Sequence, residues 1–98
     1  METILLQLRA DQLVFVSGDI YQLPSAQVVV PDVTVSTLRP TELTLAPGRY
    51  FYRFIVTSYE RNGEFTLEGA STNRTRILIE PNKFATTPAV SDSARFTV

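Results

Sequence analysis

The sequence predicts an all-β fold, a single immunoglobulin-like β-sandwich of seven or eight strands over residues 1–98. Short apolar segments recur at the spacing of strands, residues typical of turns separate them, and no segment has the period of an amphipathic helix. A small β-barrel is the alternative, because a barrel is built from the same strand pattern. No internal repeat and no linker divides the chain, so we expect one domain.

The first part of the chain predicts several short strands. In residues 3–9 apolar and polar side chains alternate, so Ile4, Leu6 and Leu8 should share one buried face. The further strands expected here are residues 13–16, which form a continuous apolar run, 20–23, 26–30 and 33–38. Residues typical of turns end these segments, at positions 11–12, 17–19, 24, 31–32 and 40.

Two turn motifs predict a three-stranded meander in the middle of the chain. Pro47-Gly48 fits a type II turn, because proline presets φ and glycine accepts a positive φ. Asn62-Gly63 lies between two apolar runs and fits a two-residue hairpin loop. We therefore expect residues 42–45, 49–60 and 65–70 to pair with one another, in this order, within one sheet.

The two turns place the same apolar side chains on one face of this meander. Pairing across Pro47-Gly48 puts Leu45 opposite Tyr50 on that face, and Glu42 opposite Arg53 on the other. The expected core face comprises Leu43, Leu45, Tyr50, Tyr52, Phe54, Val56, Phe65 and Leu67. Burial of each large side chain contributes roughly 1.5–3 kcal/mol, so this face should form much of the core.

The last third of the chain predicts two strands around a loop. Residues 75–80 form the first strand, with Ile77 and Ile79 on one side. Residues 81–93 are rich in Pro, Asn, Thr and Ser and predict a long loop. Residues 94–98 alternate again and predict a terminal strand.

The composition excludes several kinds of site. The chain has no Cys and no His, so it lacks thiolate ligands, cysteine nucleophiles, the commonest general base and the commonest transition-metal ligand. Asp11, Asp19 and Asp32 lie at expected strand ends, where a Ca²⁺ site is conceivable, but their spacing matches no calcium-binding loop and Asp is common in turns. We therefore expect no enzymatic activity, no metal and no cofactor.

The charge and hydropathy patterns bear on partners and location. The net charge is −1, which favours neither nucleic acid nor an anionic membrane. No segment has the length of a membrane span. The first residues carry an acid and lack the basic region of a signal peptide. We expect a cytoplasmic protein or a part of a larger assembly, with no nucleic-acid or membrane partner.

The opposite face of the central strand is the candidate binding site. Its residues are Arg49, Phe51, Arg53, Ile55 and Tyr59, which alternate with the expected core residues. Arginine and aromatic side chains are enriched at the energetic centres of protein interfaces. This stripe therefore predicts a surface for a protein partner or for self-association. The alternative is that another strand or the N-terminal segment of the same chain covers it.

Two segments resemble the starch- and glycogen-binding modules found beside amylolytic enzymes. Residues 45–56, Leu-Ala-Pro-Gly-Arg-Tyr-Phe-Tyr-Arg-Phe-Ile-Val, are similar to the hairpin of those modules, and residues 13–18, Leu-Val-Phe-Val-Ser-Gly, to their early strand. The resemblance implies a β-sandwich and carbohydrate binding. Tyr21, Tyr59 or Phe84 would then stack on sugar rings, since the chain has no Trp.

These observations predict a non-catalytic interaction module with a protein-binding or assembly role. Carbohydrate binding of the starch- and glycogen-binding type is the alternative function.

Overall fold

The computed structural model describes residues 1–58, 63–72, 76–85 and 91–98, and the side chains of all of these except 58, 80–85 and 91. The described residues form no helix. Their eight strands are β1 (Glu2–Arg9), β2 (Val14–Leu23), β3 (Gln27–Ser36), β4 (Thr41–Leu45), β5 (Arg49–Ser58), β6 (Glu64–Ser71), β7 (Ile77–Ala85) and β8 (Ser91–Thr97).

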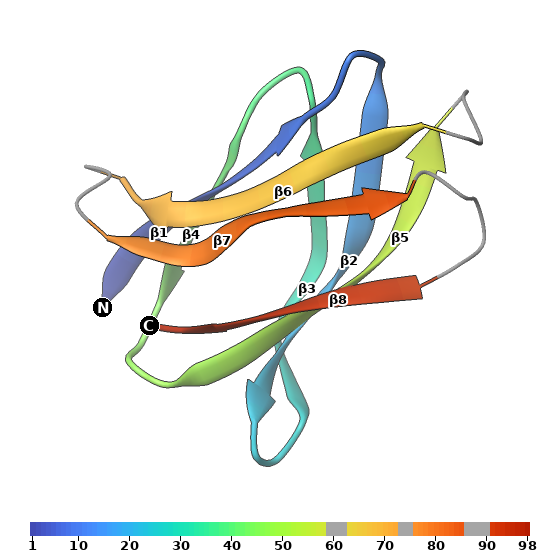
Figure 1. Cartoon of the computed structure of the whole chain (residues 1–98). Coiled ribbons are helices and arrows are strands. Elements are labelled where there is room, and N and C mark those ends of the chain that lie inside the picture. Colours follow the sequence, from blue (N-terminus) through green and yellow to red (C-terminus); the bar gives the residue numbers. More distant parts are fainter. Residues whose placement is uncertain (59–62, 73–75, 86–90) are drawn as a thin grey trace.

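The strands form two antiparallel sheets that pack face to face (Figure 1). The orders are β4-β1-β6-β7 and β3-β2-β5-β8. The predicted β-sandwich is thus confirmed. The sheets do not close on themselves, so the barrel alternative is wrong.

The core lies between the two sheets and is built from the inward-facing residues of both. The sheet of β4, β1, β6 and β7 contributes the buried side chains Ile4, Leu6, Leu8, Leu45, Phe65, Leu67 and Ile79. The facing sheet contributes Val14, Val16, Ile20, Val33, Val35, Tyr50, Tyr52, Phe54, Val56, Ala94 and Phe96. All eight residues expected on the meander's core face are buried, except Leu43, which is half-buried and packs against the core.

The predicted meander itself is wrong, because its three strands do not pair with one another. β4 pairs with β1, β5 pairs with β2 and β8, and β6 pairs with β1 and β7. Glu42 accordingly lies opposite Leu5, and Arg53 lies opposite Asp19 rather than Glu42. The chain crosses between sheets at both predicted turns. A strand that crosses a sandwich keeps its apolar residues toward the core, so the burial pattern alone cannot distinguish a crossing from a hairpin.

The crossing from β4 to β5 is a hydrogen-bonded corner instead of the expected type II turn. The Tyr50 hydroxyl donates to the Ala46 carbonyl at 2.6 Å. Gly48 exchanges two backbone hydrogen bonds with Val98, at 3.0 and 2.8 Å, which extend the ladder between β5 and β8. Its φ of 159° is close to extended. The corner thus aligns Arg49 and the start of β5 with the terminal strand.

The breaks expected at residues 17–19 and 31–32 are also wrong, because β2 and β3 each continue through them as one long strand. Where the breaks were expected, the pairing register of β2 and β3 shifts after Gly18. Asp32 of β3 has a positive φ of 56°. Asp19 Oδ1 accepts a hydrogen bond from the Asp32 N–H at 3.0 Å. Pro31 is tolerated because β3 is an edge strand. This register shift is a β-bulge, and it allows β2 and β3 to remain paired as one hairpin although β3 contains Pro31.

The C-terminal region contains more strand than the sequence indicates. The prediction of a loop over residues 81–93 is partly wrong, because β7 continues to Ala85 and β8 begins at Ser91. Pro81 is tolerated within β7 because β7 is an edge strand. Residues 86–90 lie outside the described part of the chain. Ile77 and Ile79 do not share a face. Ile79 is buried and Ile77 is exposed, because the register of β6 and β7 shifts between their partners.

Candidate interaction surface

The candidate surface is the solvent-facing side of the β3-β2-β5-β8 sheet, here called the outer face. Its central strand is β5, in which buried and outward residues alternate strictly. Arg49, Arg53 and Ile55 are exposed and Phe51 is half-buried. Tyr59, the fifth residue expected in this stripe, lies outside the described residues. The four described members thus share one side of one strand.

An aromatic pair lies at the centre of the outer face. Tyr21 of β2 is the direct cross-strand partner of Phe51. The two rings stack in parallel, with centroids 4.7 Å apart and an interplanar angle of 7°. Both residues are half-buried, so one face of each ring contacts the other ring while part of each remains in solvent. The pair forms a rigid apolar ridge across β2 and β5.

Arginines surround this aromatic pair. Arg49 and Arg53 lie two residues before and after Phe51 on β5, and Arg95 of β8 lies directly opposite Phe51. All three arginines are exposed. Among the described residues, none of them forms an ion pair or a side-chain hydrogen bond. Three guanidinium groups on the outer face therefore remain available to a ligand.

Asp19 is the acidic residue nearest in register to these arginines. It lies opposite Arg53 in the β2–β5 ladder. Its Oδ1 accepts the Asp32 N–H, so this carboxylate helps to hold the β3 bulge. Positive charge accordingly gathers toward β8, on the side of Arg49 and Arg95.

A hollow of about 250 Å³ opens between those two arginines. Its lining residues are Leu23, Arg49, Tyr50, Arg95, Phe96 and Thr97. The rings of Tyr50 and Phe96 are buried and stack on each other, with 5.6 Å between centroids. The hollow thus combines two arginines with an apolar residue, Leu23.

The described chain does not cover the outer face. Ile55 is 55% exposed. The N-terminal strand β1, one of the segments that could have covered this face, lies in the opposite sheet. Within the described residues, the outer face is therefore open to solvent.

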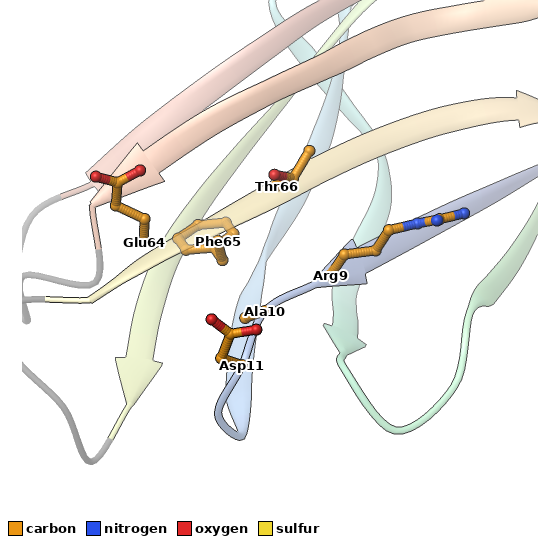
Figure 2. A pocket seen from close by; sticks show the side chains of 6 residues that line it. All are labelled: Arg9, Ala10, Asp11, Glu64, Phe65 and Thr66. Atoms are coloured by element: carbon orange, nitrogen blue, oxygen red, sulfur yellow. The ribbon is translucent and has the colours of Figure 1, made fainter.

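A second hollow, of about 380 Å³, lies at one end of the sandwich (Figure 2). It is lined by Arg9, Ala10, Asp11, Glu64, Phe65 and Thr66. The carboxylates of Asp11 and Glu64 are exposed, and Arg9 extends away from both in Figure 2 toward Glu68, at 3.4 Å. Both acids that line this hollow are therefore exposed side chains.

The aspartates weighed for Ca²⁺ binding do not converge. Asp19 and Asp32 are joined by a hydrogen bond, whereas Asp11 lines the separate hollow of Figure 2. Among the residues that the structure describes, no three His, Cys, Asp or Glu side chains are grouped as metal ligands.

The sequence pattern does not assign two members of the outer face to it. Tyr21 is expected only as a sugar-stacking residue, and Arg95 is not among the expected site residues. The alternation of Ala94 and Phe96 with Arg95 was a usable signal, since it places Arg95 outward once β8 is assigned as a strand. Their position beside Phe51 depends on which strands pair, which local patterns do not reveal.

No helix in the described part of the chain is long and apolar enough to cross a membrane. Searches against protein-family models, curated proteins and solved structures find no match to this chain.

Proposed function

We propose that this protein is a non-catalytic β-sandwich interaction module that binds a protein partner through its outer face. The observation that supports the proposal is the exposed surface around the Tyr21–Phe51 stack, whose arginines form no ion pair with the residues that the structure describes. Arginine and aromatic residues contribute most of the binding energy at many interfaces. The surface also lies on paired strands of one sheet, so little conformational entropy is lost when a partner binds.

The absence of His and Cys from the sequence supports a non-catalytic role. The exposed acids around the hollow of Figure 2 also support a non-catalytic role. We propose no cofactor and no metal for this function.

Affinity capture with matched surface variants tests the proposal. The wild-type chain, Ile55→Asp and Ile77→Asp are immobilised and exposed to an extract of the source cells. Ile77 is a matched control because it is also an isoleucine, is 44% exposed and lies on β7 of the opposite sheet. A partner retained by the wild-type chain and by Ile77→Asp, but lost with Ile55→Asp, supports the proposal, and titration of the purified partner then gives its Kd.

Self-association through the same face is checked by sedimentation velocity. A concentration-dependent dimer that Ile55→Asp abolishes would identify the partner as a second copy of the chain. A monomer whose capture profile is the same for wild type and Ile55→Asp would refute the proposed function.

Carbohydrate binding is the second candidate function, and the half-exposed Tyr21 ring on the outer face favours it. Phe51 covers one face of that ring, which leaves less area for a sugar to stack on. The Tyr59 and Phe84 side chains lie outside the described residues. Calorimetric titration with α-glucans, using wild type and Tyr21→Ala, separates the two candidates: heat of binding that Tyr21→Ala removes supports carbohydrate binding, and a flat titration eliminates it.

We further propose that the sandwich is immunoglobulin-like in architecture rather than in strand order. The hydrogen bond from Tyr50 to Ala46 supports the likeness, since such a tyrosine corner is typical of these sandwiches. The order differs, because β1 and β2 lie in different sheets, whereas the first two strands of an immunoglobulin domain share one.

A further inference from the structure

We infer that the partner contributes an extended acidic segment, one carboxylate of which enters the hollow between Arg49 and Arg95. This inference deepens the proposed function and rests on it. It follows from three features of the outer face: the spacing of its arginines, the lack of an acidic partner for them within the described part of the chain, and the apolar groups between them.

The spacing of the arginines suits an extended chain. Side chains two apart on a strand are separated by roughly 6–7 Å, so Arg49 and Arg53 are about 13 Å apart along β5. Arg95 is a diagonal neighbour of both across the β5–β8 ladder, at roughly 7–8 Å. An extended segment that lies along β5 presents its own alternate side chains at the same period. Carboxylates at alternate positions could therefore meet successive guanidinium groups.

The positive charge of the arginines at this hollow favours an acidic ligand. Arg49 and Arg95 have no carboxylate partner among the described residues, and both line one hollow. A guanidinium group holds a carboxylate through paired, charge-assisted hydrogen bonds, which are about twice as strong as neutral ones. Two guanidinium groups on one concave site give a carboxylate more donors than one exposed arginine would.

Apolar groups on the same face favour a peptide over a simple polyanion. Leu23 lines the hollow, the Tyr21–Phe51 stack lies beside it, and Ile55 is exposed further along β5. A polyphosphate chain has no apolar side chains and would leave these groups unmatched. A peptide with acidic and aliphatic side chains matches both the charge and the apolar area.

The test uses the full chain and three synthetic peptides. The probe alternates Glu and Val over seven residues with blocked ends, and the matched peptides carry Gln or Lys in place of Glu. We expect the Glu peptide to bind and its Kd to rise with salt, because exposed ion pairs are screened. The Gln and Lys peptides should bind at least about tenfold more weakly, since hydrogen bonds to charged groups contribute about 1.5–3 kcal/mol.

Charge-matched variants locate the site. Arg49→Gln combined with Arg95→Gln should weaken binding of the Glu peptide about tenfold or more. Arg39→Gln combined with Arg76→Gln removes the same charge from two exposed arginines that do not line this hollow, and should change it less than about twofold. All of these side chains are exposed, so the urea midpoints should match that of the wild type. Equal losses in both variants, or no binding of the Glu peptide, would overturn the inference.

The remaining outcomes separate the inference from the proposed function. If the captured partner depends on Ile55 but not on Arg49 and Arg95, the interaction module stands and the acidic segment is wrong. If capture is insensitive to Ile55 as well, the proposed function fails with it. Tighter binding of a single-stranded oligonucleotide than of the Glu peptide, lost with Arg49→Gln and Arg95→Gln, would assign the site to nucleic acid and refute the acidic peptide.

Discussion

The hydroxyl of Tyr52 is the most deeply placed polar side-chain group of the described core. It donates a hydrogen bond to the Val33 carbonyl at 2.7 Å, and the residue is fully buried. The bond joins β5 to the bulged part of β3 across the intervening strand β2. Burial, with a smaller effect from the charge of Asp19, raises the pKa of Tyr52 well above its usual range.

Tyr52→Phe should destabilise the protein by about 1–3 kcal/mol, because the Val33 carbonyl would remain buried without its donor. Urea unfolding followed by circular dichroism at neutral pH measures the change. An unchanged midpoint would show that water or another group replaces the hydroxyl.

The same residue makes stability depend on alkaline pH. The pKa of Tyr52 is raised in the folded state, so above the ordinary tyrosine pKa of about 10 the unfolded chain loses this proton while the folded chain keeps it. The contribution is fully present below about pH 10 and falls as the pH rises further. The urea midpoint should therefore decrease between about pH 9 and about pH 11, and less steeply in Tyr52→Phe. Parallel slopes would contradict this assignment.

Gly18 is required by a close approach of two backbones. A Cβ atom there would collide with the Arg53 carbonyl and lie 2.7 Å from the Phe54 Cα. Gly18→Ala should cost about 1–3 kcal/mol or more, since two paired strands would have to separate locally. At Gly63 the atoms nearest to an added Cβ belong to the side-chain amide of Gln12, the end of a flexible side chain. Gly63→Ala is thus the control, and equal urea midpoints for the two variants would refute the argument.

At the scale of elements, the hairpin of β2 and β3 depends on its bulge. The side chain of Asp19 accepts the Asp32 N–H where the register shifts, while Tyr52 accommodates the Val33 carbonyl on the inner side. The β-bulge is thus stabilised by one side-chain hydrogen bond on each face of the sheet.

Asp19→Ala should accelerate amide hydrogen exchange at Asp32 and cost about 0.5–1.5 kcal/mol, because that amide loses its protein acceptor. Exchange followed by NMR measures the local effect. Asp11→Ala is the control, since Asp11 lies in the separate hollow of Figure 2. Unchanged protection at Asp32 would show that the bulge does not need the carboxylate.

At the scale of the molecule, the two sides of β5 differ in exposure. Val56 is 4% exposed and faces the opposite sheet, whereas its neighbour Ile55 faces solvent. One side of β5 therefore contributes to the core, and the other side is the surface at which we propose that the partner binds.

Substitution of these neighbours by alanine should separate stability from binding. Val56→Ala should cost about 2 kcal/mol, the transfer energy of its methyl groups plus a cavity. Ile55→Ala should change stability by less than about 0.5 kcal/mol and weaken capture of the partner. Thermal unfolding and the capture experiment measure the two effects, and a similar loss of stability in both variants would mean that the outer face is covered.

Local sequence patterns are sufficient to predict the class of the fold, and also which residues of the central strand face the core and which face outward. Alternation with a period of two is local, and a sandwich buries one side of every strand, so Tyr50, Tyr52, Phe54 and Val56 could be assigned to the core without knowing their neighbours. The same alternation placed Arg49, Phe51, Arg53 and Ile55 outward.

Which strands pair with one another is seen only in the tertiary structure. Pro47-Gly48 and Asn62-Gly63 suggested hairpins, yet β5 pairs with β2 and β8, because pairing depends on contacts between residues far apart in the sequence. That choice brought Tyr21 and Arg95 to Phe51 and formed the hollow beside Arg49. Local turn chemistry specifies where a chain bends, while the energy of burying both sheets together decides which sheet the next strand joins.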